Sequence, residues 1–234
     1  ELGTMHRGEK SLAYEMIRAA KEAGADICKF QFGWSREAQE AQAHNYKPER
    51  YVDDWADDLA EWCAYLNIEL MASIWSQEGL DTARRVGMKR YKIAAQMAGN
   101  YDLCGKIYAD GKPVFVSLDR HSPHADFHKG MATRIPIWCM SKYPCYPVDL
   151  VASDAYPGMP REFTSFWYGY SDHAHGIAPA LLACARGAHY IEAHFCLGKD
   201  DLFVRDTPFA KTPAEFAEMV RLGRELNRLT EIGV

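Results

Sequence analysis

The chain has 234 residues, of which 48% are hydrophobic, and a formal net charge of −5. These values suit one large globular domain, and the acidic balance excludes a basic field that would attract nucleic acid. No apolar stretch reaches the ~18 residues of a membrane span and no signal peptide is visible, so we expect no membrane partner and a cytoplasmic protein. The seven cysteines include no C-x-x-C pair and are expected to be buried, reduced thiols.

Apolar periodicity and turn residues predict that helices and strands alternate along the chain. Helices are predicted over residues 10–23, 51–66, 77–86, 100–109, 177–186 and 212–229, the last with Thr212 as its N-cap. Strands are predicted over residues 26–32, 69–73, 90–95, 113–117, 135–140, 166–170 and 189–195. Between residues 117 and 134 we expect at most a short helix.

The alternation also indicates the fold. Glu1 resembles the end of a further strand, which brings the expected number of strands to eight. Eight strands that alternate with helices favour an α/β fold, a closed (β/α)8 TIM barrel over residues 1–234, rather than an open doubly wound sheet. The first strand would be incomplete at its N-terminus, and we expect residues to precede Glu1 in the natural protein.

Two histidines mark a candidate metal site. His173 and His194 lie at or just past the ends of the last two predicted strands. Consecutive strands of a parallel sheet end on the same side, so both imidazoles should meet at one rim. Either histidine alone would more simply be a hydrogen-bonded loop or core residue. As a pair, with Ser171, Asp172 and Glu192 around them, they favour a divalent metal such as manganese, iron or cobalt.

The same rim should collect cationic and hydroxyl side chains. Side-chain alternation turns Lys29 and Gln31 to one face of their strand and predicts that Lys92 also points inward. Lysines and hydroxyls around one mouth suit a phosphate-bearing anion. Alternatively, inward lysines pair with carboxylates inside the barrel. Glu192 shares a face with His194, and we expect it to neutralise one lysine and to leave the other available.

Six motifs carry a family resemblance, and they occur in order at residues 1–8 (ELGTMHRG), 23–31 (AGADICKFQ), 91–94 (YKIA), 141–144 (SKYP), 169–173 (GYSDH) and 191–195 (IEAHF). Together they resemble the N-terminal barrel of the sialic acid synthase family (N-acetylneuraminate synthase and its legionaminate and pseudaminate relatives). The resemblance implies a transferase of sialic acid biosynthesis. Such an enzyme condenses phosphoenolpyruvate with the open-chain aldehyde of an N-acylated amino sugar, giving a nine-carbon keto sugar acid.

The resemblance also implies roles for individual residues. His173 and His194 match the ligands of a divalent metal cofactor, usually Mn²⁺, which polarises the aldehyde. Glu1 matches a catalytic carboxylate that could handle the proton of the attacking water, and His173 and Lys92 are further catalytic candidates. Contacts to phosphoenolpyruvate are implied for Lys29, Ser73, Lys92, Ser117, Ser141 and Ser171. Contacts to the sugar are implied for Gln31, Tyr143 and Asp206, and the implied assembly is a homodimer.

The chain departs from the family pattern near the sugar. The family has Ser-Gly followed by an acid after the lysine of strand four, whereas Lys92 is followed here by Ile-Ala-Ala-Gln-Met, which puts Met97 at the acidic position. A thioether is no base and accepts hydrogen bonds weakly. We therefore expect poor turnover of N-acetylmannosamine, unless Asp119 or Asp206 takes over. The small antifreeze-like C-terminal domain of the family, which supplies an arginine to the sugar, is also expected to be absent.

Other functions and sites remain open from the sequence. One is condensation with a sugar phosphate, as in related keto-acid synthases, for which a second basic cluster would be needed. Another is a non-catalytic barrel that binds phosphoenolpyruvate or a sugar acid, or serves as a partner subunit, which Met97 and the absence of the C-terminal domain would favour. The histidines His121, His124 and His128 could form a second metal site on a helix, but the flanking polar residues favour a solvated loop. Trp167 and Tyr168 could form a sugar platform, although strand packing is favoured.

Overall fold

The computed structural model describes most of the chain, namely residues 1–35, 52–119, 122–142, 145–151, 158–163, 166–200, 204 and 206–231. At its centre lies one parallel sheet of seven strands. Strands that follow one another along the chain are also neighbours in the sheet. They are β1 (Ile27–Phe32), β2 (Glu69–Ile74), β3 (Tyr91–Ile93), β4 (Val114–Leu118), β5 (Arg134–Cys139), β6 (Gly169–Asp172) and β7 (Tyr190–Ala193).

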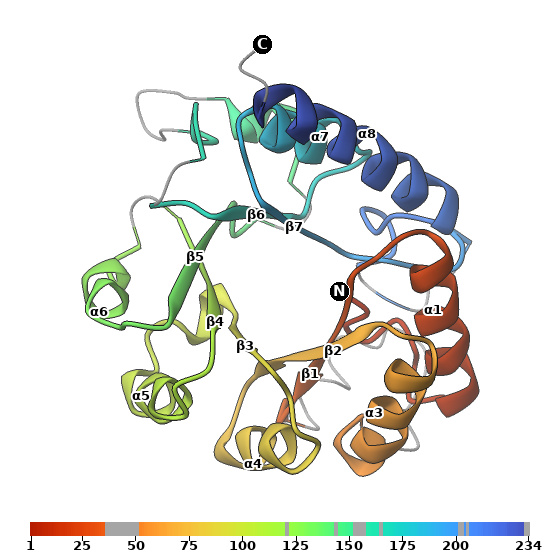
Figure 1. Cartoon of the computed structure of the whole chain (residues 1–234), viewed down its shortest axis with the longest axis vertical. Coiled ribbons are helices and arrows are strands. Elements are labelled where there is room, and N and C mark those ends of the chain that lie inside the picture. The colour runs from red at the N-terminus through yellow and green to blue at the C-terminus, as the bar shows by residue number, and fades with distance from the viewer. Residues whose placement is uncertain are drawn as a thin grey trace.

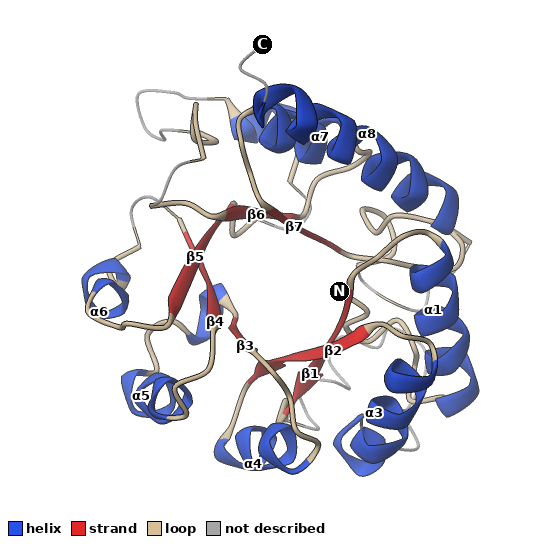
Figure 2. Ribbon diagram, in the orientation of Figure 1, coloured by secondary structure: helices blue, strands red, loops and turns tan. Residues whose placement is uncertain are grey.

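The sheet curls on itself, and helices surround its outer face (Figure 1, Figure 2). In the described part of the chain these are α1 (Lys10–Glu22), α3 (Ala56–Tyr65), α4 (Gln77–Arg85), α5 (Tyr101–Ala109), α6 (Ala125–Lys129), α7 (Ala178–Ala185) and α8 (Pro213–Glu231). All six predicted helices are therefore confirmed. The one predicted over residues 51–66 begins as a 3-10 turn, η1 (Val52–Trp55), and continues as α3. The short helix expected between residues 117 and 134 is α6.

Polar side chains cap the starts of helices, as the sequence indicates. The hydroxyl of Ser76 accepts a hydrogen bond from the Gly79 N–H at the start of α4. Before α8, Thr212 Oγ1 accepts from the Glu215 N–H at 3.4 Å, and the Glu215 carboxylate accepts from the Thr212 N–H at 2.8 Å. This reciprocal pair is a capping box, and it confirms Thr212 as the N-cap.

Glu1 and Leu2 occupy the gap between the two edges of the sheet. The main-chain nitrogen of Glu1 donates to the Ala193 carbonyl at 2.9 Å, and the Phe195 N–H donates to the Glu1 carbonyl at 3.0 Å. On the other side, the Leu2 N–H donates to the Lys29 carbonyl at 2.8 Å. The eighth strand predicted at Glu1 is not formed among the described residues, because only these two residues pair there. The structure thus shows a curled sheet of seven strands, and a complete (β/α)8 barrel is not demonstrated.

Three predicted strands differ clearly in length or position, and one of them, β7, is shorter at both ends than the predicted 189–195. β6 begins at Gly169 and not at residue 166, because Phe166 and Tyr168, whose aromatic rings suggested a strand, are 39% and 41% exposed. β3 ends at Ile93, since the chain then enters a 3-10 turn, η2 (Ala95–Met97). Aromatic and apolar residues favour a strand, but they do not determine where it pairs with its neighbours.

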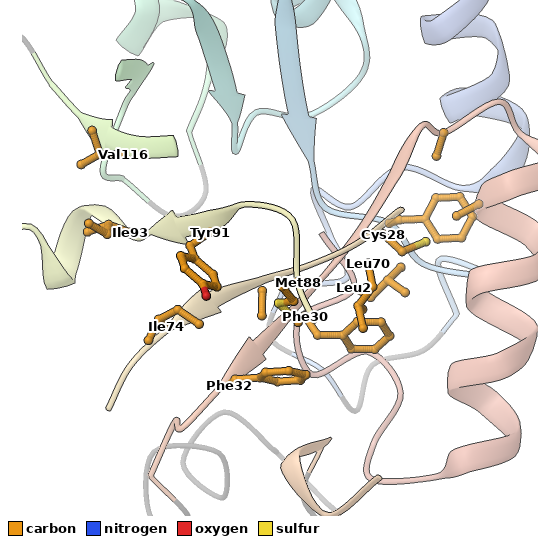
Figure 3. Close-up of a cluster of buried hydrophobic side chains, with 14 of the residues drawn as sticks. Leu2, Cys28, Phe30, Phe32, Leu70, Ile74, Met88, Tyr91, Ile93 and Val116 are labelled. Atoms are coloured by element: carbon orange, nitrogen blue, oxygen red, sulfur yellow. The ribbon is translucent and has the colours of Figure 1, made fainter. Parts of the chain in front are cut away.

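Alternation along the strands divides the core into layers. Outward side chains pack between sheet and helices, and Figure 3 shows this cluster, with Cys28, Phe30, Phe32, Ile74, Tyr91, Ile93 and Val116 among its labelled members. On the inner face, a second apolar cluster contains Met71, Phe115 and Ile137 and packs against Ile27 and Tyr190. Two residues further along the same strands, the inner face carries Lys29, Ser73, Ser117, Cys139 and Glu192. The inside of the curled sheet is therefore apolar toward the N-terminal ends of the strands and mainly polar toward their C-terminal ends.

The state of the cysteines and the character of the helices can be compared with what the composition predicts. All seven cysteines are buried and free, so the prediction of reduced thiols without a disulfide framework is confirmed. Across the described residues, no helix combines the length and the apolar character needed to cross a membrane.

Gly79 brings α4 close to the end of β1, and this contact can be tested. A Cβ at Gly79 would lie 2.4 Å from the Phe32 carbonyl oxygen and 2.7 Å from the Gly33 nitrogen, both main-chain atoms. Gly79→Ala should therefore lower the free energy of unfolding by about 1–3 kcal/mol, as measured by urea denaturation. The matched control is Gly105→Ala in α5, where the new Cβ meets nothing within 4 Å. That variant should gain about 0.5–1 kcal/mol. A Gly79→Ala protein as stable as the wild type would contradict this packing.

Candidate functional site

A cavity of about 270 Å³ opens where the strands end. Its lining includes every predicted site residue that the structure describes: Glu1, Lys29, Gln31, Ser73, Lys92, Ser117, Ser141, Ser171, His173, His194 and Asp206. Tyr143, the remaining predicted residue, lies outside the described residues. The parallel sheet explains this convergence, because each strand delivers its last inward side chains to the same end.

Two buried lysines share one carboxylate at the base of the cavity. Lys29 Nζ lies 3.7 Å from Glu192 Oε2, and Lys92 Nζ lies 3.6 Å from Glu192 Oε1. Lys29 also forms an ion pair with the carboxylate of Glu1. The prediction that Glu192 would pair with one lysine and leave the other available is therefore wrong. The curled sheet brings inward residues of β1, β3 and β7 to one point, so Glu192 reaches both ammonium groups.

Serine hydroxyls complete the network. Lys29 Nζ donates to Ser73 Oγ at 3.0 Å, and Lys92 Nζ donates to Ser117 Oγ at 2.7 Å. Each lysine thus bonds to a serine on the next strand of the sheet. The Ser171 hydroxyl donates to Glu192 Oε1 at 2.8 Å. These hydroxyls fix the buried charged groups in position, whereas Ser141, the last predicted serine, is exposed at the mouth.

The electrostatics keep the shared carboxylate ionised. Burial alone would raise the pKa of Glu192, but the adjacent Lys29 and Lys92 outweigh it and hold that pKa below its ordinary value. Burial lowers the pKa of Lys29 to about 8, and the charge of Glu192 opposes this shift. Two lysines and two carboxylates therefore balance one another, so the cavity base carries directed charged groups without an excess of positive charge.

The two histidines meet beside this network. Their ring centroids are 5.6 Å apart. His173 Nδ1 lies 3.1 Å from the Met140 carbonyl oxygen, which can only accept, so Nδ1 carries the proton and Nε2 is left with a lone pair. Burial lowers the pKa of His173 to about 4, and burial together with the neighbouring His173 lowers the pKa of His194 well below its ordinary value. Both rings are therefore neutral at physiological pH, the form that binds metals.

The geometry of the pair fits a shared metal ion. A metal about 2.1 Å from a ring nitrogen lies about 3.3 Å from that ring's centroid, so two ligating rings have centroids within about 6.6 Å of each other. The bond from His173 to a main-chain carbonyl is the kind of outer contact that orients a metal-binding histidine. His194 Nδ1 lies 3.5 Å from Asp206 Oδ2. Among the described residues, no group of three or more His, Cys, Asp or Glu side chains is arranged to hold a metal. The pair therefore fits an open site and not a closed structural one.

Two tryptophans, which the sequence did not single out as site residues, line the same cavity. The rings of Trp34 and Trp75 have centroids 5.4 Å apart and form an aromatic wall. The buried Oε1 atom of Gln31, which lines the same cavity, has no hydrogen-bond partner among the described residues. An apolar wall beside a polar amide suits a ligand with both apolar and hydrogen-bonding groups. The sequence signal was the position of Trp75 just after the end of β2.

Met97, expected at the acidic position near the sugar, is not among the residues that line the cavity. It packs against the hydrophobic core, whereas Gln96 lines the cavity. The 3-10 turn that follows β3 shifts the inward position by one residue. Of the two alternative carboxylates, Asp206 is part of the lining and Asp119 is not.

The other candidate residues lie away from the cavity. Both ring nitrogens of His128 are occupied, by the Tyr108 hydroxyl at 2.8 Å and by the Ala98 carbonyl at 2.9 Å. His124 bonds to a tyrosine hydroxyl, and His121 lies outside the described residues. His128 is thus a buried structural residue, neither a metal ligand nor part of a solvated loop. Trp167 is buried and Tyr168 is exposed, and neither residue lines the cavity.

Comparisons with known proteins identify the family to which the chain belongs. The sequence matches the NeuB family over residues 16–233. The N-acetylneuraminate-9-phosphate synthase of Mus musculus is 28% identical over 254 residues, which cover 97% of this chain and 69% of that protein. The N,N'-diacetyllegionaminic acid synthase of Legionella pneumophila is 28% identical over 229 residues, which cover 85% of this chain and 63% of the relative.

A solved structure shows the same similarity in three dimensions. The N-acetylneuraminic acid (sialic acid) synthetase from Leptospira borgpetersenii serovar Hardjo-bovis, in complex with citrate, matches with a TM-score of 0.81 at 26% identity. The match covers 100% of this chain and 84% of that chain. Because the family match spans most of the sequence and the fold agrees, this chain belongs to the NeuB family, whose members similar to it include sialic acid synthases and related sugar acid synthases.

Proposed function

We propose that this chain is a sialic acid synthase-like transferase. It condenses phosphoenolpyruvate with the open-chain aldehyde of an N-acylated amino sugar to give a nine-carbon keto sugar acid. The supporting observation is that the network of Lys29, Glu192 and Lys92 and the pair His173 and His194 line one cavity. Family membership also supports a closed (β/α)8 barrel as the complete fold.

Phosphoenolpyruvate would bind over the lysines. Its phosphate and carboxylate are anionic, and ammonium groups that hydroxyls already orient offer short charge-assisted hydrogen bonds at little further entropic cost. Lys29 and Lys92 would hold the two anionic groups, and Ser73, Ser117 and Ser141 would supply further hydrogen bonds. Glu192 fixes the distance between the two ammonium groups.

Charge balance supports a divalent cation in the same cavity. The two lysines are matched by Glu1 and Glu192, and both histidines are neutral. A phosphate-bearing anion that enters would be left without a countercharge from the described lining, at considerable cost in a buried site. His173 and His194 would hold the metal, and Mn²⁺ suits an open site of this kind. When bound, the metal polarises the aldehyde oxygen as a Lewis acid.

The chain's own residues would then position the reactants and move the proton of water. C3 of phosphoenolpyruvate attacks the aldehyde carbon, water adds to C2, and phosphate leaves. Glu1 faces the cavity, and its Oε1 atom accepts the Gly3 N–H at 2.7 Å, which fixes the carboxylate. Glu1 takes the proton of the attacking water. Gln31 and Asp206, which also line the cavity, bind the sugar hydroxyl and amide groups.

Among the described residues, no second basic cluster supports the sugar-phosphate alternative. Arg120 lies outside the described residues, and the exposed Lys142 is paired with Asp149 at 2.6 Å. Met97 was one of two features that favoured a non-catalytic barrel, and it packs against the core and does not line the cavity.

The proposed reaction can be tested by phosphate release from phosphoenolpyruvate with Mn²⁺ and a panel of N-acylated amino sugars. Lys92→Met should lower kcat/KM at least about 100-fold, because it removes a cation that binds the transferring anion. The matched control is Lys112→Met, a partly buried lysine that bonds to the Met88 carbonyl at 2.7 Å and is not part of the cavity lining. It should stay within about twofold of the wild type. No phosphate release by the wild type with any sugar, or full activity of Lys92→Met, would contradict the proposal.

The pH dependence of Mn²⁺ binding follows from the histidine pKa values. A lowered pKa means that protons compete with the metal only at lower pH, and the pKa of His173 is about 4. Calorimetric titration should therefore give the same Mn²⁺ affinity from pH 8 to about pH 5.5, and His194→Ala should abolish binding. Two histidines with ordinary pKa values near 6.5 would instead lose affinity steeply below that pH. Such a loss between pH 7 and pH 6 would refute the buried neutral pair.

A further inference from the structure

Lys211 is a fully buried lysine that the proposed reaction does not use. It precedes α8 and lies outside the cavity lining. Its Nζ atom forms an ion pair with Asp172 Oδ2 at 3.1 Å, and both side chains are completely buried. The same Nζ donates to the Ala174 carbonyl at 2.5 Å and to the Phe209 carbonyl at 3.1 Å. A buried ammonium group with these three oxygen partners is well compensated.

The partners of this ammonium group lie on both sides of His173. Asp172 comes directly before that histidine and Ala174 directly after it, so Nζ holds the chain at each end of the residue. Asp172 is itself fixed, because its Oδ1 atom accepts the Tyr170 hydroxyl at 2.9 Å and the Ala174 N–H at 3.0 Å. The side chain of Lys211 therefore anchors the segment that carries the first histidine.

The main chain of Lys211 holds the second histidine. Its N–H donates to the His194 carbonyl at 2.7 Å, and its carbonyl accepts the Cys196 N–H at 3.0 Å. These two bonds form an isolated parallel bridge between Lys211 and Phe195. One residue is thus bonded through its main chain to the His194 segment and through its side chain to the His173 segment.

We propose that Lys211 is a positioning residue that sets the separation and angle of His173 and His194. The inference rests on the proposed function, because these two histidines are the proposed metal ligands. The ion pair lies directly beyond the last paired residues of the two strands, since Asp172 is the final residue of β6 and pairs with Ala193 of β7. Outer contacts of this kind typically change metal affinity by about 10–100-fold when they are removed.

The double variant Asp172→Asn with Lys211→Met tests this role without leaving a charge buried and unpaired. The Asn side chain can still accept from Tyr170 and Ala174, and the main-chain bonds of residue 211 remain. The variant therefore removes the side-chain link from residue 211 to the His173 segment, together with the Nζ bond to the Phe209 carbonyl. The matched control is Lys199→Met, which removes a lysine that donates to the Ala210 carbonyl close by and lies 3.5 Å from Glu215.

Two measurements decide the matter. The Kd for Mn²⁺ should rise at least about tenfold in the folded double variant, and the visible absorption spectrum with Co²⁺ should change, while the control keeps the wild-type Kd and spectrum. Crystals of the metal-free double variant should show that the centroid distance, now 5.6 Å, has changed.

A purely structural ion pair would instead lower Tm and leave the Kd, the spectrum and the separation of the rings as they are. That outcome would overturn the role of Lys211. If the wild type binds no Mn²⁺, the proposed metal site fails, and the ring separation in the metal-free crystals still decides whether Lys211 positions the two histidines.

Discussion

The site depends on one buried carboxylate between two lysines. Each ammonium group would be very costly inside the sheet without a partner, and removal of one member of a buried ion pair typically costs about 3–5 kcal/mol. Glu192 compensates Lys29 and Lys92 at once and so joins β1, β3 and β7 across the interior. The apolar cluster of Met71, Phe115 and Ile137 lies next to it inside the sheet, toward the N-terminal ends of the strands. The charged groups are thus fixed before any ligand arrives, a condition that efficient electrostatic catalysis requires.

The same balance explains why two kinds of side chain share one cavity. The lysines can orient an anion, but their charge is already matched, and the neutral histidines beside them can accept a cation. In the proposed function, an anionic substrate and a divalent metal would therefore complement each other in a single site. The tryptophan wall formed by Trp34 and Trp75 adds apolar surface on the side where the sugar would lie.

Local patterns predicted the alternation of helices and strands, and the family motifs supplied most of the candidate residues that line the cavity. The alternation of side chains along β1 correctly predicted that Lys29 and Gln31 point inward. Helical periodicity located all six predicted helices. Contacts between segments that are far apart in the sequence could not be predicted from local patterns. The ion pairs of Glu192 with both lysines depend on the curvature of the whole sheet. The proposed role of Lys211 depends on a segment that returns to the ends of β6 and β7. The position of Met97 depends on a tight turn, where a shift of one residue exchanges the inward and outward side chains.

A crystal structure with phosphoenolpyruvate and MnCl₂ tests the shared cavity most directly. Data collected at the manganese absorption edge should show one anomalous peak between the rings of His173 and His194, and the phosphate of phosphoenolpyruvate should contact Lys29 or Lys92. A manganese peak elsewhere, or phosphoenolpyruvate bound away from the lysines, would contradict the proposal that one cavity holds both the metal and the anion.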